Sequence, residues 1–339
     1  MNQDTLWLQV PAAKIHPVNW DNVSNVPDKL EDIAIRLASL QGSVPPCLDK
    51  INVILFIADH GVINQDEITL AQPITTELLN NFSRTDDIIH IMANKLNAKL
   101  EVVNLGTKIN LKSIDGIIHS TIATSTANFC HAQAMNNEQL ARAINIGRQS
   151  IQRIHLSGAQ LFVAREINRA NTLSALAITC ALLNIAPEEF TPNDEKHNKD
   201  IIKLVHKALT QHKDELTSPL EILQRLGSFE IAALIGSYLC CAHIGIPVLI
   251  DGFASAVAAF ITIRLCPGAE QWFLYSQTPN NPAHKLILDT LKAQPLLQLK
   301  QNIDNMASIT TALSLLHLAC TSHNQKRSFS KEELLKRYF

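Results

Sequence analysis

Acidic, basic and amide side chains follow directly behind the apolar runs of this sequence. Four of them are Asp59, His60, Glu166 and Asp251. Carboxylate and imidazole groups can accept or donate a proton, and they can hold a polar ligand through hydrogen bonds. The alternative for each is a structural role, in which the side chain caps a helix or bonds a neighbouring loop. These residue types indicate acid–base or ligand-binding chemistry without choosing a reaction.

Two further features lie close to these side chains in the sequence. Gly61 follows Asp59 and His60, and its lack of a side chain allows the backbone to turn close to a ligand. Asn171 and Thr172 bring an amide and a hydroxyl to the expected start of a helix, where backbone N–H groups without partners favour anions. A helix cap beside a surface ion pair is the competing interpretation of this second segment.

The apolar runs that carry these side chains are typical of strands buried on both faces. They are Ile51–Ala58, Lys99–Leu105, Gln160–Ala164 and Pro247–Ile250. Stretches with helical periodicity alternate with them: Lys29–Leu40, Thr75–Leu96, Asn137–His155, Thr172–Leu183, Asp200–His212, Phe229–His243, Ala254–Leu265, Ile309–Cys320 and Lys331–Tyr338. This alternation predicts an α/β fold with a parallel sheet. Loops and helix N-termini converge at the carboxyl ends of such strands, so we expect a ligand site there.

Composition and charge argue against several classes of protein. The 339 residues are 46% hydrophobic and 18% charged, which is typical of a folded chain. A net charge of −2 without a basic block argues against extended nucleic-acid binding, and no uninterrupted apolar run is long enough to span a bilayer. The chain contains no P-loop, GxGxxG, HExxH or GxSxG motif, and its seven cysteines are scattered. We expect a cytoplasmic protein with reduced thiols, no metal, no cofactor, no nucleic-acid partner and no membrane contact.

Six segments, taken in order and spacing, resemble one known family. They are ADHGV at Ala58–Val62, VVNLG at Val102–Gly106, AMN at Ala134–Asn136, RE..RANT at Arg165–Thr172, and RLGSFEIAAL with IPVLIDGF at Arg225–Phe253. The family is that of the nicotinate-nucleotide:dimethylbenzimidazole phosphoribosyltransferases. The resemblance extends from about Leu30 to about Cys320.

The resemblance implies a fold, an assembly and a reaction. The fold would be a Rossmann-like parallel sheet flanked by helices in a large domain, 45–300, with a small helical subdomain formed from both termini, 1–44 and 301–339. The assembly would be a homodimer. The reaction would transfer the phosphoribosyl group of nicotinate mononucleotide to the benzimidazole that becomes the lower ligand of cobalamin, releasing nicotinate. The partners would be a small nucleotide and an aromatic base.

The residue that the family uses as its base is changed in this chain. A glutamate in a GEG(T/S)G segment of the family takes the azole proton, and the ungapped register places Asn305 at that position. An amide cannot accept this proton, so the adjacent Asp304 or the strand-end Glu166 would have to assist. The glycine-rich stretch that binds phosphate in the family is replaced by PEEFTPNDEKHNKD at Pro187–Asp200. Without glycine, the backbone approaches a phosphate less closely.

The substrate-binding positions implied by the resemblance divide into altered and retained residues. Leu70 and Leu78 stand where the family has a polar serine and glutamine, and Gln277 stands for a histidine. Apolar Ile167 follows the strand-end glutamate. The retained residues are Asp59, His60, Glu166, Asn171, Thr172 and Asp251.

Three functional hypotheses follow. The first is a divergent transferase of this family, which the resemblance favours. The second is a catalytically impaired or inactive homologue that binds a nucleotide or base, or that pairs with an active paralogue as a heterodimer. The third is an enzyme with a more apolar acceptor, because Leu70 and Leu78 would suit one.

Overall fold

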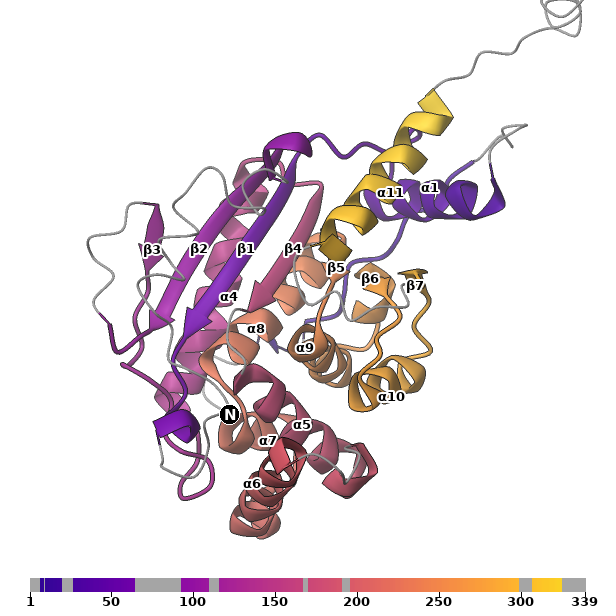
Figure 1. The fold of residues 1–339 in the computed structure, drawn as a ribbon. Coiled ribbons are helices and arrows are strands. Elements are labelled where there is room, and N and C mark those ends of the chain that lie inside the picture. The colour runs from indigo at the N-terminus through magenta and orange to yellow at the C-terminus, as the bar shows by residue number, and fades with distance from the viewer. Residues whose placement is uncertain are drawn as a thin grey trace, which may run out of the picture.

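A computed structural model describes the chain over residues 7–8, 10–19, 27–64, 93–109, 116–166, 170–190, 196–298 and 307–324. Within these residues the fold is a single sheet flanked by helices (Figure 1). No helix among them is long and apolar enough to cross a membrane.

The sheet has seven strands in the order β3-β2-β1-β4-β5-β6-β7. The strands are β1 (Ile51–Ala58), β2 (Ala98–Gly106), β3 (Ile117–His119), β4 (Leu161–Glu166), β5 (Val248–Ile250), β6 (Phe273–Gln277) and β7 (Pro295–Leu297). Every neighbouring pair is parallel. The chain builds outward from β1 in one direction and from β4 in the other, so the strand order reverses between β1 and β4. The predicted Rossmann-like α/β fold is confirmed.

The four predicted strands are present, and three short strands were missed. All eight residues of β1 are buried, which is why its sequence is apolar without alternation. The missed strands β3 and β7 are three-residue edge strands with partly exposed side chains, so no continuous apolar run marks them. The missed β6 has four buried residues, but its last two residues, Ser276 and Gln277, are polar, so its sequence does not form a long apolar run.

Nine α-helices are described: α1 (Asp28–Gln41), α4 (Asn137–Leu156), α5 (Ala170–Leu183), α6 (Lys196–His212), α7 (Pro219–Leu226), α8 (Phe229–Ile244), α9 (Phe253–Leu265), α10 (Pro282–Thr290) and α11 (Ala307–Asn324). The helices α7 and α10 were not predicted, because each has only about two turns, and the helical spacing of apolar residues repeats too few times to be recognised. Both begin with a capping residue followed by proline, Ser218-Pro219 and Asn281-Pro282, which is a start signal that sequence reading could have used. The predicted helix Lys331–Tyr338, and Thr75–Leu96 up to residue 92, lie outside the described residues.

Helices α4, α8 and α9 form a layer against the central strands of the sheet. Helix α8 contacts β1 and β4, α9 contacts β4 and β5, and α4 packs on α8. In Figure 1, α4 and α8 lie behind the sheet, the arrowheads of β1, β2 and β4 point downward, and α5, α6 and α7 lie in the lower part of the molecule. Side-chain bonds connect the carboxyl end of β1 to the first turns of α8 and α5 through His60, Glu230 and Asn171.

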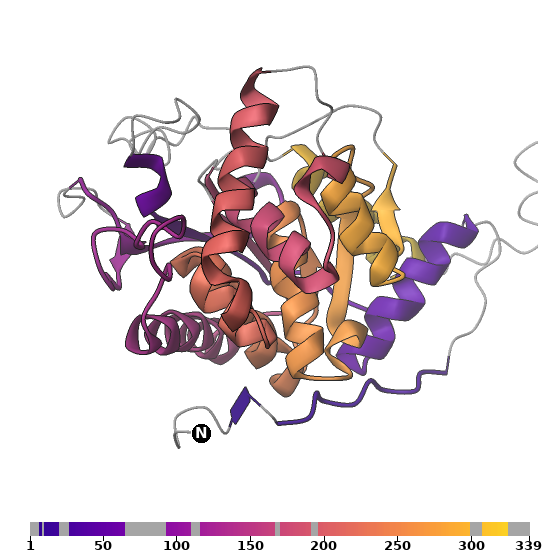
Figure 2. The same cartoon turned by 90° about the horizontal axis from the view of Figure 1, so that it is seen from below.

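Helix α1 packs against α11, which also contacts β6. Helices from near the two ends of the chain thus lie side by side, as Figure 1 shows. Residues 10–19 run as an extended segment along the molecule (Figure 2), where Ala13 N–H donates to Ala242 O at 2.7 Å and Trp272 Nε1 donates to Ala13 O at 3.0 Å. The division into domains 45–300 and 1–44 plus 301–339 stays a prediction.

Helices α4 and α8 approach each other at two glycines. A Cβ on Gly147 of α4 would lie 1.9 Å from the Ala233 carbonyl oxygen, and a Cβ on Gly236 of α8 would lie 1.9 Å from the Ile144 carbonyl oxygen. Ser237 Oγ also donates to the Gly147 carbonyl at 3.2 Å. Each backbone therefore occupies the space that a side chain on the other helix would need.

We expect Gly147→Ala and Gly236→Ala each to lower the free energy of unfolding by about 1–3 kcal/mol through overpacking. Helix propensity alone predicts the opposite sign, a gain of about 1 kcal/mol. Chemical denaturation measures the difference, and Gln149→Ala on the exposed side of α4 is the control, with an expected change within about 0.5 kcal/mol. A more stable glycine variant would contradict the close approach.

His284 in α10 is a buried, uncharged histidine. Its ring stacks on Phe253 with centroids 5.6 Å apart. Burial lowers the pKa of His284 from about 6.5 to about 4. Between pH 4 and 6.5, His284 is therefore protonated in the unfolded chain and neutral in the folded chain.

We expect the stability supported by neutral His284 to be complete above pH 6.5 and to be lost as the pH falls toward 4. Between pH 7 and 4 the wild-type protein should lose about 2–3 kcal/mol more than His284→Gln. Urea unfolding across this pH range checks the slope. His155→Gln, at an exposed histidine of α4, should keep the wild-type slope, and an unchanged slope in His284→Gln would refute the account.

Candidate active site

The candidate active site lies where the strand order reverses, at the carboxyl ends of β1 and β4. The chain leaves β1 at Ala58 and β4 at Glu166, and the neighbouring strands continue in opposite directions across the sheet. In open α/β sheets, ligands bind in the crevice that this divergence creates. The predicted position of the site is therefore the position that this strand order favours.

Asp59 joins the loops that follow β1 and β2. It is 1% exposed, and its Oδ2 accepts a hydrogen bond from Lys108 N–H at 2.8 Å. Its backbone N–H donates to Gly106 O at 2.8 Å, and its carbonyl accepts from Thr126 N–H at 3.2 Å. The Asp59 side chain thus bonds the loop after β2, whereas the structural alternative considered from sequence was a cap on the next segment, and its substrate-binding role stays a prediction.

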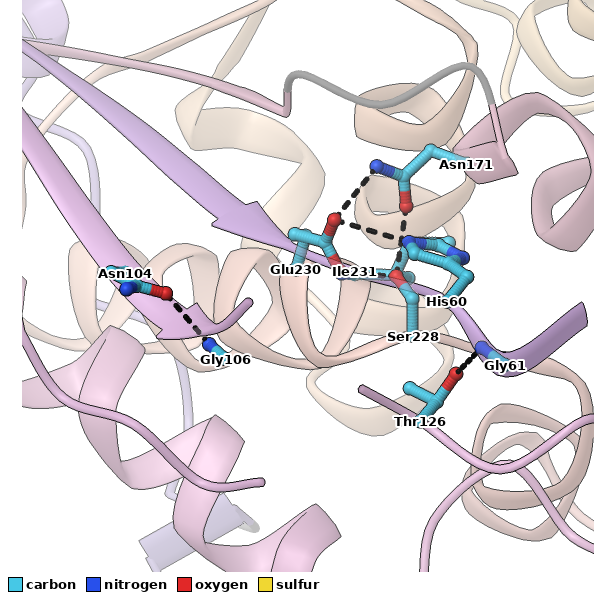
Figure 3. Close-up of polar contacts among 9 residues, drawn as sticks. All are labelled: His60, Gly61, Asn104, Gly106, Thr126, Asn171, Ser228, Glu230 and Ile231. Carbon is cyan, nitrogen blue, oxygen red and sulfur yellow. Dashed lines mark hydrogen bonds and ion pairs between the residues drawn. The ribbon is translucent and has the colours of Figure 1, made fainter. Parts of the chain in front are cut away.

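Gly61 approaches backbone at the position where the sequence suggested a ligand. Its N–H donates to Thr126 Oγ1 at 3.3 Å (Figure 3). A Cβ at this position would lie 2.4 Å from the Thr126 carbonyl oxygen, so the segment 126–128 fills that space. Glycine is required here for the packing of two loops.

His60 and Asn171 meet at a carboxylate that the sequence analysis did not single out, Glu230. His60 Nε2 lies 3.1 Å from Glu230 Oε1, and Asn171 Nδ2 donates to the same oxygen at 3.2 Å. Ser228 Oγ donates to Asn171 Oδ1 at 2.8 Å and accepts from Ile231 N–H at 3.2 Å. Figure 3 shows this network of His60, Asn171, Ser228 and Glu230, which we call the carboxylate network.

Three elements position the carboxylate network. Ser228 is the N-cap of α8, Glu230 lies in the first turn of that helix, and Asn171 lies in the first turn of α5. His60 follows β1 directly. All four side chains are 1% exposed or less. The N-termini of two helices and the end of a central strand are thereby tied together out of contact with water.

Two atoms of the carboxylate network have no hydrogen-bond partner among the described residues. They are His60 Nδ1 and Glu230 Oε2, and both are buried. A buried polar atom without a partner costs about 1–3 kcal/mol. Such atoms at the carboxyl edge of an α/β sheet are candidates for contact with a ligand.

A second polar group lies at the ends of β5 and β6. Arg165 NH1 lies 3.5 Å from Asp251 Oδ2, and Ser276 Oγ donates to Asp251 Oδ1. Asp251 is 3% exposed. Gln277 Oε1 is buried and lacks a hydrogen-bond partner within the described part of the chain. Asp251 and Gln277 are therefore brought to the same edge as His60, although on strands further along the sheet.

The other predicted site residues are placed only in part. Thr172 lies in the first turn of α5 with an exposed side chain. Glu166 is the last residue of β4, and only its backbone is described. Residues outside the described ranges are Leu70, Leu78, Ile167, Asp304 and Asn305. The roles given to all of these residues stay predictions.

The sequence contained a signal for the omitted Glu230. It is the one acidic residue in the apolar helix α8, and its neighbours on both sides are buried. A carboxylate in such a run must be paired, because an isolated buried charge is very costly. The partner could not be read from local pattern, since His60 is 170 positions away.

We expect Ser228→Ala to lower the free energy of unfolding by about 2–3 kcal/mol, because the α8 cap is lost and Asn171 Oδ1 is left unsatisfied. The matched control is Ser218→Ala at the N-cap of α7, where Ser218 Oγ accepts from Glu221 N–H and the expected loss is about 1 kcal/mol. Equal losses in the two variants would mean that the bond to Asn171 contributes nothing.

Fold and site together define a doubly wound α/β protein with a polar site at the point where its strand order reverses. Comparison with known proteins adds the family. A family model described as "Phosphoribosyltransferase" matches residues 28–333. The chain belongs to the nicotinate-nucleotide–dimethylbenzimidazole phosphoribosyltransferase family.

The relatives match over nearly the whole chain. The protein named nicotinate-nucleotide–dimethylbenzimidazole phosphoribosyltransferase from Pseudomonas aeruginosa strain UCBPP-PA14 is 38% identical over 307 residues, which cover 89% of this chain and 88% of the relative. The protein of the same name from Pseudomonas syringae pv. syringae strain B728a is 37% identical, with 89% and 87% covered. A crystal structure of the Thermus thermophilus protein of this name aligns with a TM-score of 0.79 at 28% identity, covering 95% of this chain and 94% of that one.

Proposed function

We propose that this protein transfers the phosphoribosyl group of nicotinate mononucleotide to dimethylbenzimidazole. In this reaction the bond between the anomeric carbon and the pyridine nitrogen breaks, and the pyridine nitrogen keeps the electron pair. A new bond forms between the anomeric carbon and an azole nitrogen. The other azole nitrogen gives up its proton to a base. The products are nicotinate and the ribotide of the benzimidazole.

The observation that carries this proposal is the match to named phosphoribosyltransferases, 38% identical over 89% of the chain. The position of the polar side chains supports it. Asp59, His60, Asn171 and Asp251 are buried at the carboxyl edge of the sheet, and the resemblance gives substrate-binding roles to these residues. The substrates are small molecules, a nucleotide and an aromatic base, which suits a site between loops and helix N-termini.

The reaction needs a held nucleotide, a stacked base and a proton acceptor. Arg165 places a guanidinium at the end of β4 beside Asp251, where it adds positive charge to an edge that must receive a phosphate and a carboxylate. The proton acceptor is the part that differs from the family, because Asn305 stands at the position of the family's glutamate. Asp304 and Glu166 are the candidates that the sequence offers.

We expect purified protein to form the benzimidazole ribotide from nicotinate mononucleotide and dimethylbenzimidazole in a single-turnover experiment. Chromatography of the quenched reaction measures the product. Two variants accompany the wild type: Asn305→Glu restores the family residue, and Asp304→Ala removes the adjacent carboxylate. General-base catalysis is worth about 100- to 10,000-fold, so Asn305→Glu should increase the rate if its position still faces the acceptor.

Each outcome has a definite meaning. Product from the wild type supports the transferase. Product from Asn305→Glu alone would indicate a scaffold that binds both substrates and has lost its base, as expected for a catalytically impaired homologue. No product from either chain would refute the transferase proposal for these substrates.

We also propose that the protein acts in the cytoplasm as a homodimer, as the resemblance implies. Light scattering on the same preparation measures the mass in solution, and a monomer mass of 37.5 kDa would contradict the dimer.

A further inference from the structure

We propose that His60, held by Glu230, is the base that takes the azole proton in this chain. The inference rests on the proposed function and assigns one step of it. It also removes the need for a carboxylate at position 305, because the acceptor is an imidazole at the end of β1.

The carboxylate network determines which nitrogen of His60 carries hydrogen. Ile231 N–H donates to Ser228 Oγ at 3.2 Å, which directs the hydroxyl hydrogen toward Asn171 Oδ1 at 2.8 Å. The Asn171 amide then points its Nδ2 at Glu230 Oε1, at 3.2 Å. A carboxylate oxygen accepts, so His60 Nε2 at 3.1 Å is the donor.

The other nitrogen of His60 is then the acceptor. In the neutral ring, a proton on Nε2 leaves a lone pair on Nδ1. Nδ1 is buried and has no hydrogen-bond partner among the described residues. In Figure 3 it points away from Glu230 and from Asn171. An unsatisfied acceptor of this kind at the carboxyl edge, one strand from β4, fits the N–H group of a bound azole.

The proposed step balances in protons and electrons. The azole N–H bond breaks, and its electron pair stays on the azole ring. The proton forms a bond to His60 Nδ1, which makes the ring an imidazolium. The azole nitrogen at the other position attacks the anomeric carbon as nicotinate leaves with the glycosidic electron pair. Nε2–H stays bonded to Glu230, whose negative charge at 3.1 Å stabilises the imidazolium.

Glu230 is a positioning residue in this scheme. Its Oε1 contacts His60 Nε2 and Asn171 Nδ2, and in this scheme it acts on the azole through His60. Glu230→Gln keeps an oxygen that can accept from both partners and removes the charge. The turnover number should therefore fall with little change in KM, because substrate binding does not use this charge.

The test uses a series of benzimidazoles with increasingly acidic N–H groups, from dimethylbenzimidazole to nitrobenzimidazole, with nicotinate mononucleotide as donor. We expect His60→Gln to slow transfer to dimethylbenzimidazole by about 100- to 10,000-fold. The defect should shrink as the acceptor loses its proton more easily. His60→Ala should regain activity with added imidazole. If Asp304→Ala, and not His60→Gln, slows transfer by a factor that shrinks with increasing acceptor acidity, then Asp304 takes the azole proton instead of His60.

The matched control is His212→Gln. His212 is a second buried histidine, 2% exposed, whose Nε2 bonds the Phe129 carbonyl at 2.9 Å away from the carboxylate network. A loss caused by disturbed folding should be the same for every acceptor. A His60→Gln defect that does not depend on acceptor acidity, or wild-type activity in that variant, would overturn the assignment.

A second measurement separates this inference from the proposed function. Nitrogen-15 spectra of labelled histidine, with the His60 signals identified by their absence in His60→Gln, report which ring nitrogen carries hydrogen. We expect Nε2–H, a bare Nδ1, and a shift of Nδ1 when dimethylbenzimidazole is added. A proton on Nδ1, or an Nδ1 signal that does not shift when dimethylbenzimidazole is added, would refute the assignment of His60 as the base, even if the chain has full transferase activity. A wild-type chain without turnover would refute the transferase proposal instead.

Discussion

The contact of α4 with α8 positions the first turn of α8 at the carboxyl edge of the sheet. Two backbones meet at Gly147 and Gly236, at a separation that leaves no space for a methyl group on either helix. Interiors packed this closely have little room to adjust, so α8 has one position over β1 and β4. The first turn of α8 carries Glu230 and its N-cap is Ser228, which means that an apolar crossing fixes where a buried carboxylate lies.

The buried polar groups depend on that fixed position. A carboxylate with no exposed surface is costly unless it is hydrogen-bonded, and here both partners of Glu230 bond its Oε1: His60 after β1 and Asn171 in the first turn of α5. Removing one member leaves the others unsatisfied in a low-dielectric interior, where the penalty is largest. The network therefore joins three elements in one arrangement, at the point where the two halves of the sheet diverge.

Much of the fold could be predicted from sequence, because β1 and the long helices are marked by burial. The strand β1, with all eight residues buried, is apolar at every position except Asn52, whereas β3 and β7 pair at the edges with partly exposed residues and have no such apolar run. The polar residues behind the strands could be found in the same way, and His60 and Asn171 do lie together. Their shared partner Glu230 could not be placed, because a contact across 170 positions is determined by tertiary packing and by no local period. For Asn305 the situation is reversed. The resemblance aligns it with the glutamate that acts as base in the family, but Asn305 lies outside the residues that the structure describes.

The extended segment 10–19 gives α8 a second point of attachment. Ala13 bonds the carbonyl of Ala242 near the far end of the helix and accepts from Trp272, which precedes β6. A helix of 16 residues is about 24 Å long and behaves as a stiff rod. Its first turn carries Glu230 and its last turns are bonded by Ala13, so residues 10–19 and the carboxylate network are attached to opposite ends of one helix. The N-terminal part of the chain therefore helps to hold the same helix that positions the partner of His60.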